Sequence, residues 1–224
     1  MSEPPLLFSE VRVGPNHHPL FNFEVPANRC VSVVGDEKSG LDKLGEIALG
    51  LVAPASGRAL VYGEDLSAMS NTDALAFRRR LGYLPADDGL MQNLTLGANI
   101  ALPLQFGSNY SESAIQSRTG IIMSALRIGD SAARRPAEVS EVVRRRAATA
   151  RALAFDPELV ILERPFDGIT NRAALELLQI VRGGETSQGS RRTVLIITHH
   201  VPRDLSSAVD VSYRVIEGEL RLET

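Results

Sequence analysis

Residues 30–42 read CVSVVGDEKSGLD, and this stretch joins a buried strand to a glycine-containing turn. Residues 31–34 are apolar almost throughout, which is typical of a strand in a parallel sheet that is covered on both faces. Gly35 and Gly40 then supply the backbone freedom that a tight turn needs, and a helical pattern follows Gly40. The stretch therefore predicts a strand, a tight turn and a helix, as found in α/β proteins.

Short β-branched runs alternate with longer helical patterns along the rest of the chain, which predicts α/β architecture around a parallel sheet. We expect strands at 6–13, 20–25, 30–34, 59–62, 81–84, 159–163, 193–198, 211–216 and 219–222. We expect helices at 41–51, 72–80, 111–127, 140–155 and 171–182. The chain between the strands at 81 and 159 reads as almost wholly helical, which predicts an inserted helical subdomain. Residues 183–190 are expected to form a flexible surface loop.

The composition is that of one compact globular domain, with 224 residues, 44% of them apolar and 23% charged. A chain of this length buries enough surface to fold without a metal or a disulfide. The net charge of −3 provides no basic footprint and argues against a primary nucleic-acid binder. Cys30 is the single cysteine, which excludes an internal disulfide framework and a multi-cysteine zinc site, and we expect an inert buried thiol.

The first ten residues, MSEPPLLFSE, lack the cationic start and the long apolar stretch of a signal peptide. The apolar runs at 159–162 and 194–197 are far shorter than the ~20 residues of a membrane-spanning helix. We therefore expect a cytoplasmic protein with no direct membrane insertion, which reaches a membrane system only by docking onto another protein.

Several local motifs follow one another along the chain in a specific order. They are GDEKSGLD at 35–42, LGYLPAD at 81–87, VSEVV at 139–143, RRRAATARAL at 144–153, DPEL at 156–159, VILERP at 160–165, DGIT at 167–170 and TH at 198–199. The segments at 35–42, 81–87, 139–143, 160–165, 167–170 and 198–199 resemble, in this order, the phosphate loop, Q-loop, signature, Walker B strand, D-loop and switch histidine of ABC-transporter nucleotide-binding subunits. The segments at 144–153 and 156–159, which follow the signature, are also close to the family pattern. The segments at 144–159 and 163–168 are most similar to ATPase subunits of Mce-type bacterial lipid transporters.

The resemblance covers nearly the whole chain and implies a P-loop NTPase fold. It implies a RecA-like core at 1–84 and 156–224, an antiparallel β subdomain, and a helical subdomain at 85–155, all within one domain. In such a core, backbone amides and a lysine bind the phosphates of ATP, and a serine or threonine hydroxyl binds Mg²⁺.

The phosphate loop departs from that requirement, although Gly35 and Gly40 keep its spacing. Leu41 stands at the position of the lysine and Asp42 at that of the hydroxyl, while Lys38 is the only cation between the glycines. Counting Lys43 as well, residues 35–43 carry three acids against two lysines. At an effective dielectric constant of ~20, one like-charge pair ~4 Å apart costs about 4 kcal/mol. The alternative is a plain strand-to-helix turn with no phosphate to hold, and we favour that interpretation.

The positions implied for hydrolysis are also changed. Glu163 takes the metal-shell position, and Arg164 takes the position of the glutamate that polarises water. An arginine offers no acceptor and cannot act as a general base. Ala86 replaces the Q-loop glutamine, whereas His199 retains the switch position. Whether His199 has a task or is an ordinary residue at a strand end stays open.

The signature position retains Ser140, which can still cap its helix. Glu141 and Val142 replace the two glycines whose amides receive a partner's γ-phosphate in the family. A carboxylate repels phosphate, and a β-branched side chain prevents close backbone approach. Residues 11–15 also lack the aromatic on which the family stacks adenine, and Phe8 lies too early to replace it.

These changes lead to the hypothesis that Arg164 and Asp42 form an ion pair across a vacant phosphate site. The plainer interpretation is that Arg164 pairs with any nearby carboxylate. Residues 144–146 read as the solvated face of a helix rather than a phospholipid contact. The Met/Leu-rich run at 90–104 fits the lip of a docking groove for a membrane partner, and core packing explains it equally well.

Together these features predict a degenerate, non-hydrolysing subunit of a membrane transporter, peripheral to the inner membrane through a transmembrane partner subunit. A second nucleotide-binding chain, identical or distinct, would complete the assembly. We expect no metal and no bound cofactor, with ATP and Mg²⁺ only if the site is competent. Two alternatives remain: an ATPase that uses Lys38 or Lys43, Glu163 and His199 in unusual ways, and a soluble scaffold that reuses the fold.

Overall fold

The computed structural model describes residues 3–15, 18–183 and 191–223. Most of the loop predicted at 183–190 therefore lies outside the described residues. The strands are β1 (Leu6–Arg12), β2 (Phe21–Val25), β3 (Cys30–Val34), β4 (Ser56–Val61), β5 (Leu81–Leu84), β6 (Leu159–Glu163), β7 (Thr193–Thr198), β8 (Val211–Ile216) and β9 (Glu219–Glu223). The α-helices are α1 (Leu44–Ala48), α2 (Asn71–Arg78), α3 (Leu96–Gly107), α4 (Glu112–Ala125), α5 (Glu141–Ala152) and α6 (Asn171–Gly183).

The central sheet has six strands in the order β5-β6-β7-β3-β8-β9, parallel except for β9, which runs antiparallel to β8. The bounds of β3, β5, β6, β7 and β8 agree with those predicted from the sequence. Side chains along the inner strands alternate between two apolar clusters, so both faces of the sheet are covered, as the continuous apolar runs predicted. The carboxyl ends of β3, β6 and β7 lie at one edge of the sheet, where Glu163 pairs with Ile197 and Val34 with Thr198.

A separate three-stranded antiparallel sheet has the order β2-β1-β4. Phe8 and Phe23 stack across it with ring centroids 4.8 Å apart. Helix α1 shares one apolar cluster with this sheet and with one face of the central sheet. Strand β4 begins at Ser56, three residues before the predicted start. The sequence analysis missed these first residues because they are exposed and show no apolar pattern.

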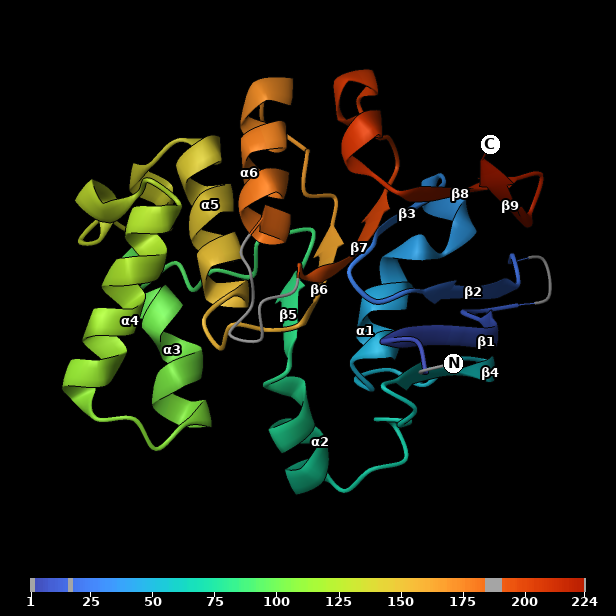
Figure 1. Cartoon of the computed structure of the whole chain (residues 1–224), viewed down its shortest axis with the longest axis horizontal. Helices are drawn as coiled ribbons and strands as arrows, with labels where there is room; N and C mark the ends of the chain where they lie inside the picture. Colours follow the sequence, from blue (N-terminus) through green and yellow to red (C-terminus); the bar gives the residue numbers. More distant parts are fainter. Residues whose placement is uncertain (1–2, 16–17, 184–190, 224) are drawn as a thin grey trace.

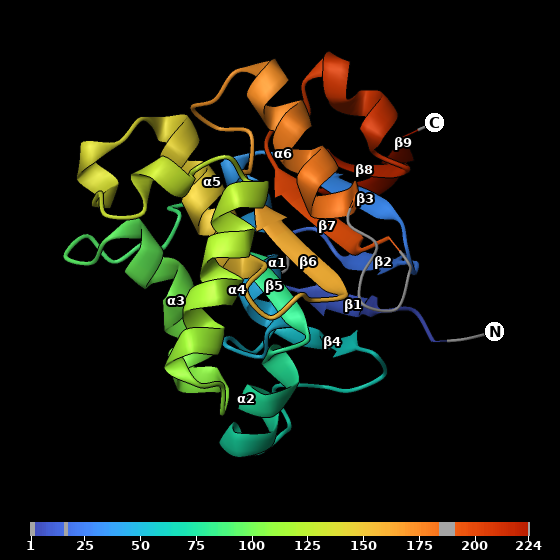
Figure 2. The same ribbon diagram turned by 60° about the vertical axis from the view of Figure 1, so that its left-hand side comes forward.

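The helices α3, α4 and α5 gather on the side of the molecule away from the three-stranded sheet (Figures 1 and 2). They share the second apolar cluster with α6 and the other face of the central sheet. The fold thus has a mainly parallel sheet, an antiparallel β subdomain and a helical subdomain, which are the parts that the resemblance to ABC-transporter nucleotide-binding subunits implies. Helix α3 was not predicted as a separate helix within the helical region. Pro103 lies inside it, and a proline usually indicates the end of a helix.

The helix predicted at 41–51 is wrong in its first turn and at its end. Two 3₁₀ turns, Glu37–Ser39 and Leu41–Lys43, precede α1, and Gly40 between them has a left-handed backbone with φ of 74°. A left-handed residue interrupts the α-helical hydrogen-bond pattern, so the α-helix begins only at Leu44. Gly50, also left-handed, follows its end.

Candidate functional site

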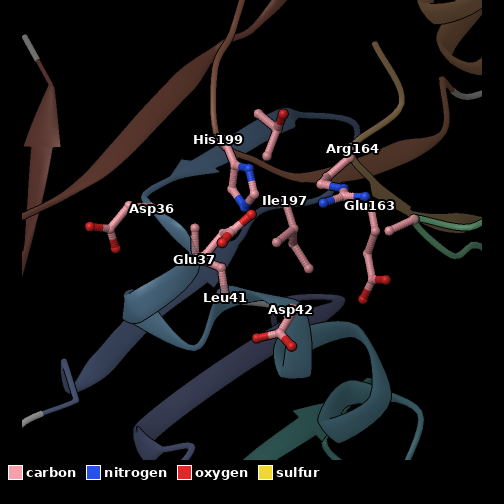
Figure 3. Close-up of a pocket in the computed structure, with 10 residues that line it drawn as sticks. Asp36, Glu37, Leu41, Asp42, Glu163, Arg164, Ile197 and His199 are labelled. Atoms are coloured by element: carbon pink, nitrogen blue, oxygen red, sulfur yellow. The ribbon is translucent and has the colours of Figure 1, made fainter. Parts of the chain in front are cut away.

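A pocket of about 370 Å³ opens at the edge of the sheet where β3, β6 and β7 end. Its walls come from the phosphate-loop segment, the end of β6, the end of β7 and the segment after β5. Figure 3 shows Glu163 and Arg164 at the end of β6, His199 after β7, and Asp42 in the turn Leu41–Lys43 around this space. The lining residues are Asp36, Glu37, Leu41, Asp42, Ala86, Glu163, Arg164, Ile197, Thr198 and His199.

The structure therefore brings together half of the site residues predicted from the sequence. Ala86, Glu163, Arg164 and His199 all line this one pocket, together with two residues of the altered phosphate loop, Leu41 and Asp42. Gly35, Lys38 and Gly40 are not among the lining residues, and the signature positions Ser140, Glu141 and Val142 are not either.

The backbone amides of the phosphate-loop segment make hydrogen bonds within the fold. The amide of Lys38 donates to the Asp36 side chain at 3.1 Å, and the amide of Ser39 donates to the Asp36 carbonyl at 3.1 Å. The amide of Lys43 donates to the Gly40 carbonyl, and that of Gly35 to the Thr198 carbonyl, each at 3.2 Å. Asp36 thus caps the first 3₁₀ turn, and these four amides already have acceptors.

Leu41, at the lysine position, is an apolar core residue that is only 2% exposed. Its Cδ1 packs over Gly35, where an added Cβ would lie 2.9 Å away. Lys43 pairs with Glu46 at 3.1 Å, and Lys38 is exposed. Neither lysine belongs to the pocket lining.

His18 is a residue at this loop that the sequence analysis missed. An added Cβ at Gly40 would lie 3.3 Å from its Nδ1 and 2.3 Å from Val13 Cγ2, so both side chains pack against the loop. The segment before β2 carried no motif that pointed to the loop. Phe8, by contrast, is fully buried in the three-stranded sheet and is not available to stack on a ligand.

Glu163 ends β6 and is only 5% exposed. Burial raises its pKa to about 7, and hydrogen bonds from Tyr83 and the Ala86 backbone oppose this rise, while Glu46 and Asp42 add to it. Burial and the neighbouring Glu163 also raise the pKa of Tyr83. An added Cβ at Gly45 would lie 2.4 Å from Glu163 Oε1, so the carboxyl group packs directly on the α1 backbone.

Arg164 follows Glu163 in a left-handed backbone conformation with φ of 44°. Its Nε lies 3.3 Å from Asp167 Oδ2, in the same turn of chain. The hypothesis of an Arg164–Asp42 ion pair is therefore wrong: the pair does not form among the described residues, although both side chains line the pocket. A partner three residues away requires less ordering of the chain than one across the pocket.

The start of α5 is capped by its own side chains. Ser140 accepts from the amide of Val143 at 3.5 Å, and Glu141 pairs with Arg144. An added Cβ at Gly168 would lie 2.8 Å from Glu141 Cγ, so Glu141 folds over the D-loop segment of its own chain. A carboxylate already lies in the first turn, where helix amides favour an anion.

The arginines at 144–146 are not a solvated face as predicted. Arg145 Nη1 lies 2.7 Å from Asp88 Oδ1, and both side chains are about 95% buried. Arg144 Nε also pairs with Asp88, at 3.0 Å, and Arg146 pairs with Glu176 at 2.8 Å. The prediction failed because the acidic partners lie on distant segments that the local pattern does not show.

Among the described residues, no helix is long and apolar enough to cross a membrane. In the same part of the chain, no group of three or more His, Cys, Asp or Glu side chains is placed to hold a metal ion. Cys30 is fully buried, as expected, and burial raises the pKa of its thiol to about 12.

Comparison with known proteins identifies the class to which this fold and pocket belong. The sequence profile of the ABC transporter family matches residues 20–167, which is more than half of the chain. The chain therefore belongs to the ABC transporter family.

Two relatives illustrate the range of the family. The chain is 26% identical over 202 residues to the intermembrane phospholipid transport system ATP-binding protein MlaF of Haemophilus influenzae, covering 90% of this chain and 75% of that protein. It is 30% identical over 205 residues to the methionine import ATP-binding protein MetN of Photorhabdus laumondii, again covering 90% of this chain but 57% of that longer protein.

The fold is also that of a solved cassette. The dimeric structure of MJ0796, a bacterial ABC transporter cassette, superposes with a TM-score of 0.86 at 20% identity and covers 98% of both chains. This likeness confirms the predicted fold class.

Proposed function

We propose that this chain is the cassette subunit of an ABC transporter and that it performs little or no ATP hydrolysis. Family membership supports the first part, because cassettes of this family pair with each other and with transmembrane permease subunits. We place the subunit at the cytoplasmic side of the inner membrane, held there by its transmembrane partner.

One observation carries the second part, namely the charge of the pocket lining. Four carboxyl groups line it, and Arg164 is the one residue among the lining residues that carries a permanent positive charge. None of these lining residues is a lysine. Every carboxylate within about 4 Å of a phosphate charge costs about 4 kcal/mol at an effective dielectric constant near 20. These carboxylates therefore disfavour a polyphosphate, and no lysine among the lining residues offsets their charge.

The loop geometry supports the same proposal. Leu41 fills the lysine position with a buried apolar side chain, and Asp36 and the Gly40 carbonyl engage amides of the loop. Arg164 stands where hydrolysis needs an acceptor and has only donors. We infer that the cleft keeps its shape and provides neither a phosphate cradle nor a general base.

The proposal has a consequence for the assembly. A homodimer would contain two impaired sites and two signature segments occupied by Glu141. We therefore propose either a distinct, competent second cassette or a structural task in the transporter.

A second groove supports docking onto a partner. It has a volume of about 470 Å³ and an apolar floor, and lies between the C-terminal parts of α2, α3 and α5. Phe106 and Leu75, which line it, are 82% and 55% exposed. Exposed apolar side chains of this size at one groove are typical of an interaction surface.

The family itself favours the second candidate, an ATPase with unusual site residues, because MlaF and MetN are both named ATP-binding proteins. In that case Lys38, on the loop, would turn inward and Glu163 would hold the metal. For the transported substrate we favour a lipid, on the similarity to MlaF and on the phrase at 144–159.

A reversion experiment tests the proposal. The variant L41K/D42S/A86Q/R164E restores the residues that the family uses at these positions. We expect it to gain MgATP affinity by at least tenfold over the natural chain in calorimetric titration. A natural chain that already binds and hydrolyses MgATP as well as the variant would favour the second candidate. Co-purification with a multi-span membrane protein separates a transporter subunit from a free scaffold.

A further inference from the structure

The apolar groove between α2, α3 and α5 carries positive charge as well as apolar side chains. Arg78 and Arg79 at the end of α2 and Arg151 in α5 line it, and none of its lining residues is an Asp or a Glu. The whole chain has the opposite balance, with 27 acidic residues against 24 lysines and arginines. The groove is therefore a basic site on an acidic protein.

No carboxylate of the described chain contacts these three arginines as an ion-pair partner. Arg78 donates to two backbone carbonyls that follow α1, at 2.8 and 3.3 Å, and Arg151 donates to two carbonyls of the segment after β5. Arg79 is exposed and makes no hydrogen bond or ion pair among the described residues. Its Nε lies beside α3, 3.8 Å from the position of a Cβ added at Gly107. Carbonyl groups carry no net charge, so the positive charge of the groove stays available to a ligand.

Arg151 shows that an anion is favoured here. Burial lowers the pKa of its guanidinium because the charged form is disfavoured away from water. The nearby carboxylates of Asp87 and Asp88 oppose this shift and do not cancel it. A further carboxylate that enters the groove would stabilise the charged form of Arg151.

The apolar part of the groove lies at the edge of the central sheet. Strand β5 is an edge strand, and its Leu81 and Tyr83 line the groove together with Ala152 of α5. On the two rims, Leu75 of α2 and Phe106 of α3 are exposed. Proteins commonly cover such sheet edges with a helix or a loop, and the apolar face of an amphipathic helix would bury both rim side chains.

We propose that the apolar groove binds an amphipathic helix of the transmembrane partner, and that this helix carries glutamate or aspartate at the edge of its apolar face, opposite Arg79. The inference deepens the proposed function and rests on its claim that the chain docks onto a membrane subunit. A groove of about 470 Å³ admits a few anchoring side chains, so the helix lies along it and inserts its apolar face. Complementary charge at the rim then selects the partner and its orientation more than it adds affinity.

Fluorescence titration of the full chain with four synthetic peptides tests the proposal. The chain contains no tryptophan, so a single tryptophan in each peptide reports binding without a background signal. The first peptide is an amphipathic helix of about 14 residues, with leucines on one face and glutamates along both edges of that face. The second has glutamines and the third has lysines in place of the glutamates. The fourth is the first peptide with a central proline, which breaks the helix.

We expect the glutamate peptide to bind about tenfold more tightly than the glutamine peptide at low salt. The difference should shrink at high salt, because salt screens exposed charges. The lysine and proline peptides should bind no more tightly than the glutamine peptide.

Two matched variants locate the binding. Arg79→Glu reverses the charge at the rim and should reduce the preference for glutamate over glutamine to a ratio of about one. Arg58→Glu reverses an exposed charge on β4, outside the lining, and should leave the preference unchanged. Far-ultraviolet circular dichroism establishes that both variants are folded.

The proposal is overturned if the glutamate peptide binds no more tightly than the glutamine peptide, or if the two variants keep the same preference. Equal binding of the proline peptide would assign an extended segment to the groove, and displacement of the glutamate peptide by low concentrations of dodecanoate would assign an anionic amphiphile. Either result also overturns it.

The proposed function is tested separately, by MgATP titration and by co-purification, so it survives each of these peptide results. A chain that keeps the peptide preference and recovers no membrane protein would sink the transporter role, and with it the assignment of the helix to a membrane partner.

Discussion

Arg145 Nη1 lies 2.7 Å from Asp88 Oδ1, and this buried pair joins the helix of the signature segment to the segment that follows β5. Asp88 has a left-handed backbone, with φ of 65°, and also pairs with Arg144. Arg151 donates to the Asp88 and Gly89 carbonyls, at 2.9 Å for the first. Three arginines of α5 therefore hold Asp88 and Gly89 in place.

Removing the acid from this cluster should destabilise the fold strongly. Asp88→Asn leaves the buried Arg145 without a counter-charge, and we expect a loss of about 3 kcal/mol in the free energy of unfolding. Asparagine tolerates the left-handed backbone, so the loss would report the charge. Urea unfolding measures it, with the exposed Asp87→Asn as control, expected within about 0.5 kcal/mol of the natural chain. Equal stability of the two variants would show that the pair contributes little.

The Glu163 carboxyl group should make stability depend on pH. Its pKa in the folded chain, about 7, lies above the ordinary value of 4.5. The protonated form is thus favoured by folding, and its contribution, complete below pH 4.5, is lost as pH rises through 7. Glu163→Gln removes this loss, and we expect it to stabilise the fold by up to about 3 kcal/mol at pH 8 and far less at pH 5. Urea unfolding of both proteins at pH 8 and pH 5 measures this effect. An equal difference in the free energy of unfolding at the two pH values would contradict a raised pKa for Glu163.

The contact between Gly45 and Glu163 should appear as coupling between two substitutions. Gly45→Ala places a Cβ 2.4 Å from Glu163 Oε1 and 2.9 Å from Tyr83 Cε2, and we expect it to cost about 2 kcal/mol. In a Glu163→Ala background the cost should fall by at least about 0.5 kcal/mol. Gly120→Ala is the control, because an added Cβ there meets nothing within 4 Å and alanine favours a helix. Additive costs would show that the carboxyl group is not the obstacle.

The exposed residues of the apolar groove should matter for docking and little for folding. Phe106→Ser removes a side chain that is 82% exposed, so we expect thermal stability to change by no more than a few degrees. Recovery of a co-purifying membrane protein should fall several-fold. The exposed Ile121→Ser, on α4 and outside this groove, should leave recovery unchanged. Unchanged recovery with Phe106→Ser would place the docking surface elsewhere.

The strands were predictable because their signal is local. The continuous apolar runs that form β6 and β7 have few other ways to be buried, and their bounds agree with the structure. The 3₁₀ turns around Gly40 were not predictable, because the hydrophobic pattern does not show the left-handed backbone of Gly40 or its close packing against Val13 and His18.

The position of the pocket in the fold was predictable from the sequence, whereas the ion-pair partners of its residues were not. Asp42, Glu163, Arg164 and His199 follow parallel strands or the turn after one, so one sheet edge collects them. The partners of Arg164 and Arg145 required three-dimensional information. Complementary charge at two site positions suggested a pair with Asp42, whereas Asp167 lies in the same turn as Arg164. Asp88, which pairs with the buried Arg145, lies in a segment that is far away in the sequence.

We propose that this cleft neither holds nor hydrolyses ATP, and titration of the natural chain with MgATP tests this proposal most directly. We expect no saturable heat up to about 1 mM nucleotide, and phosphate release no faster than in an Arg164→Ala variant. MlaF of Escherichia coli, measured in parallel, serves as the comparison. Micromolar binding accompanied by phosphate release faster than in that variant would show that the cleft is a working ATPase site.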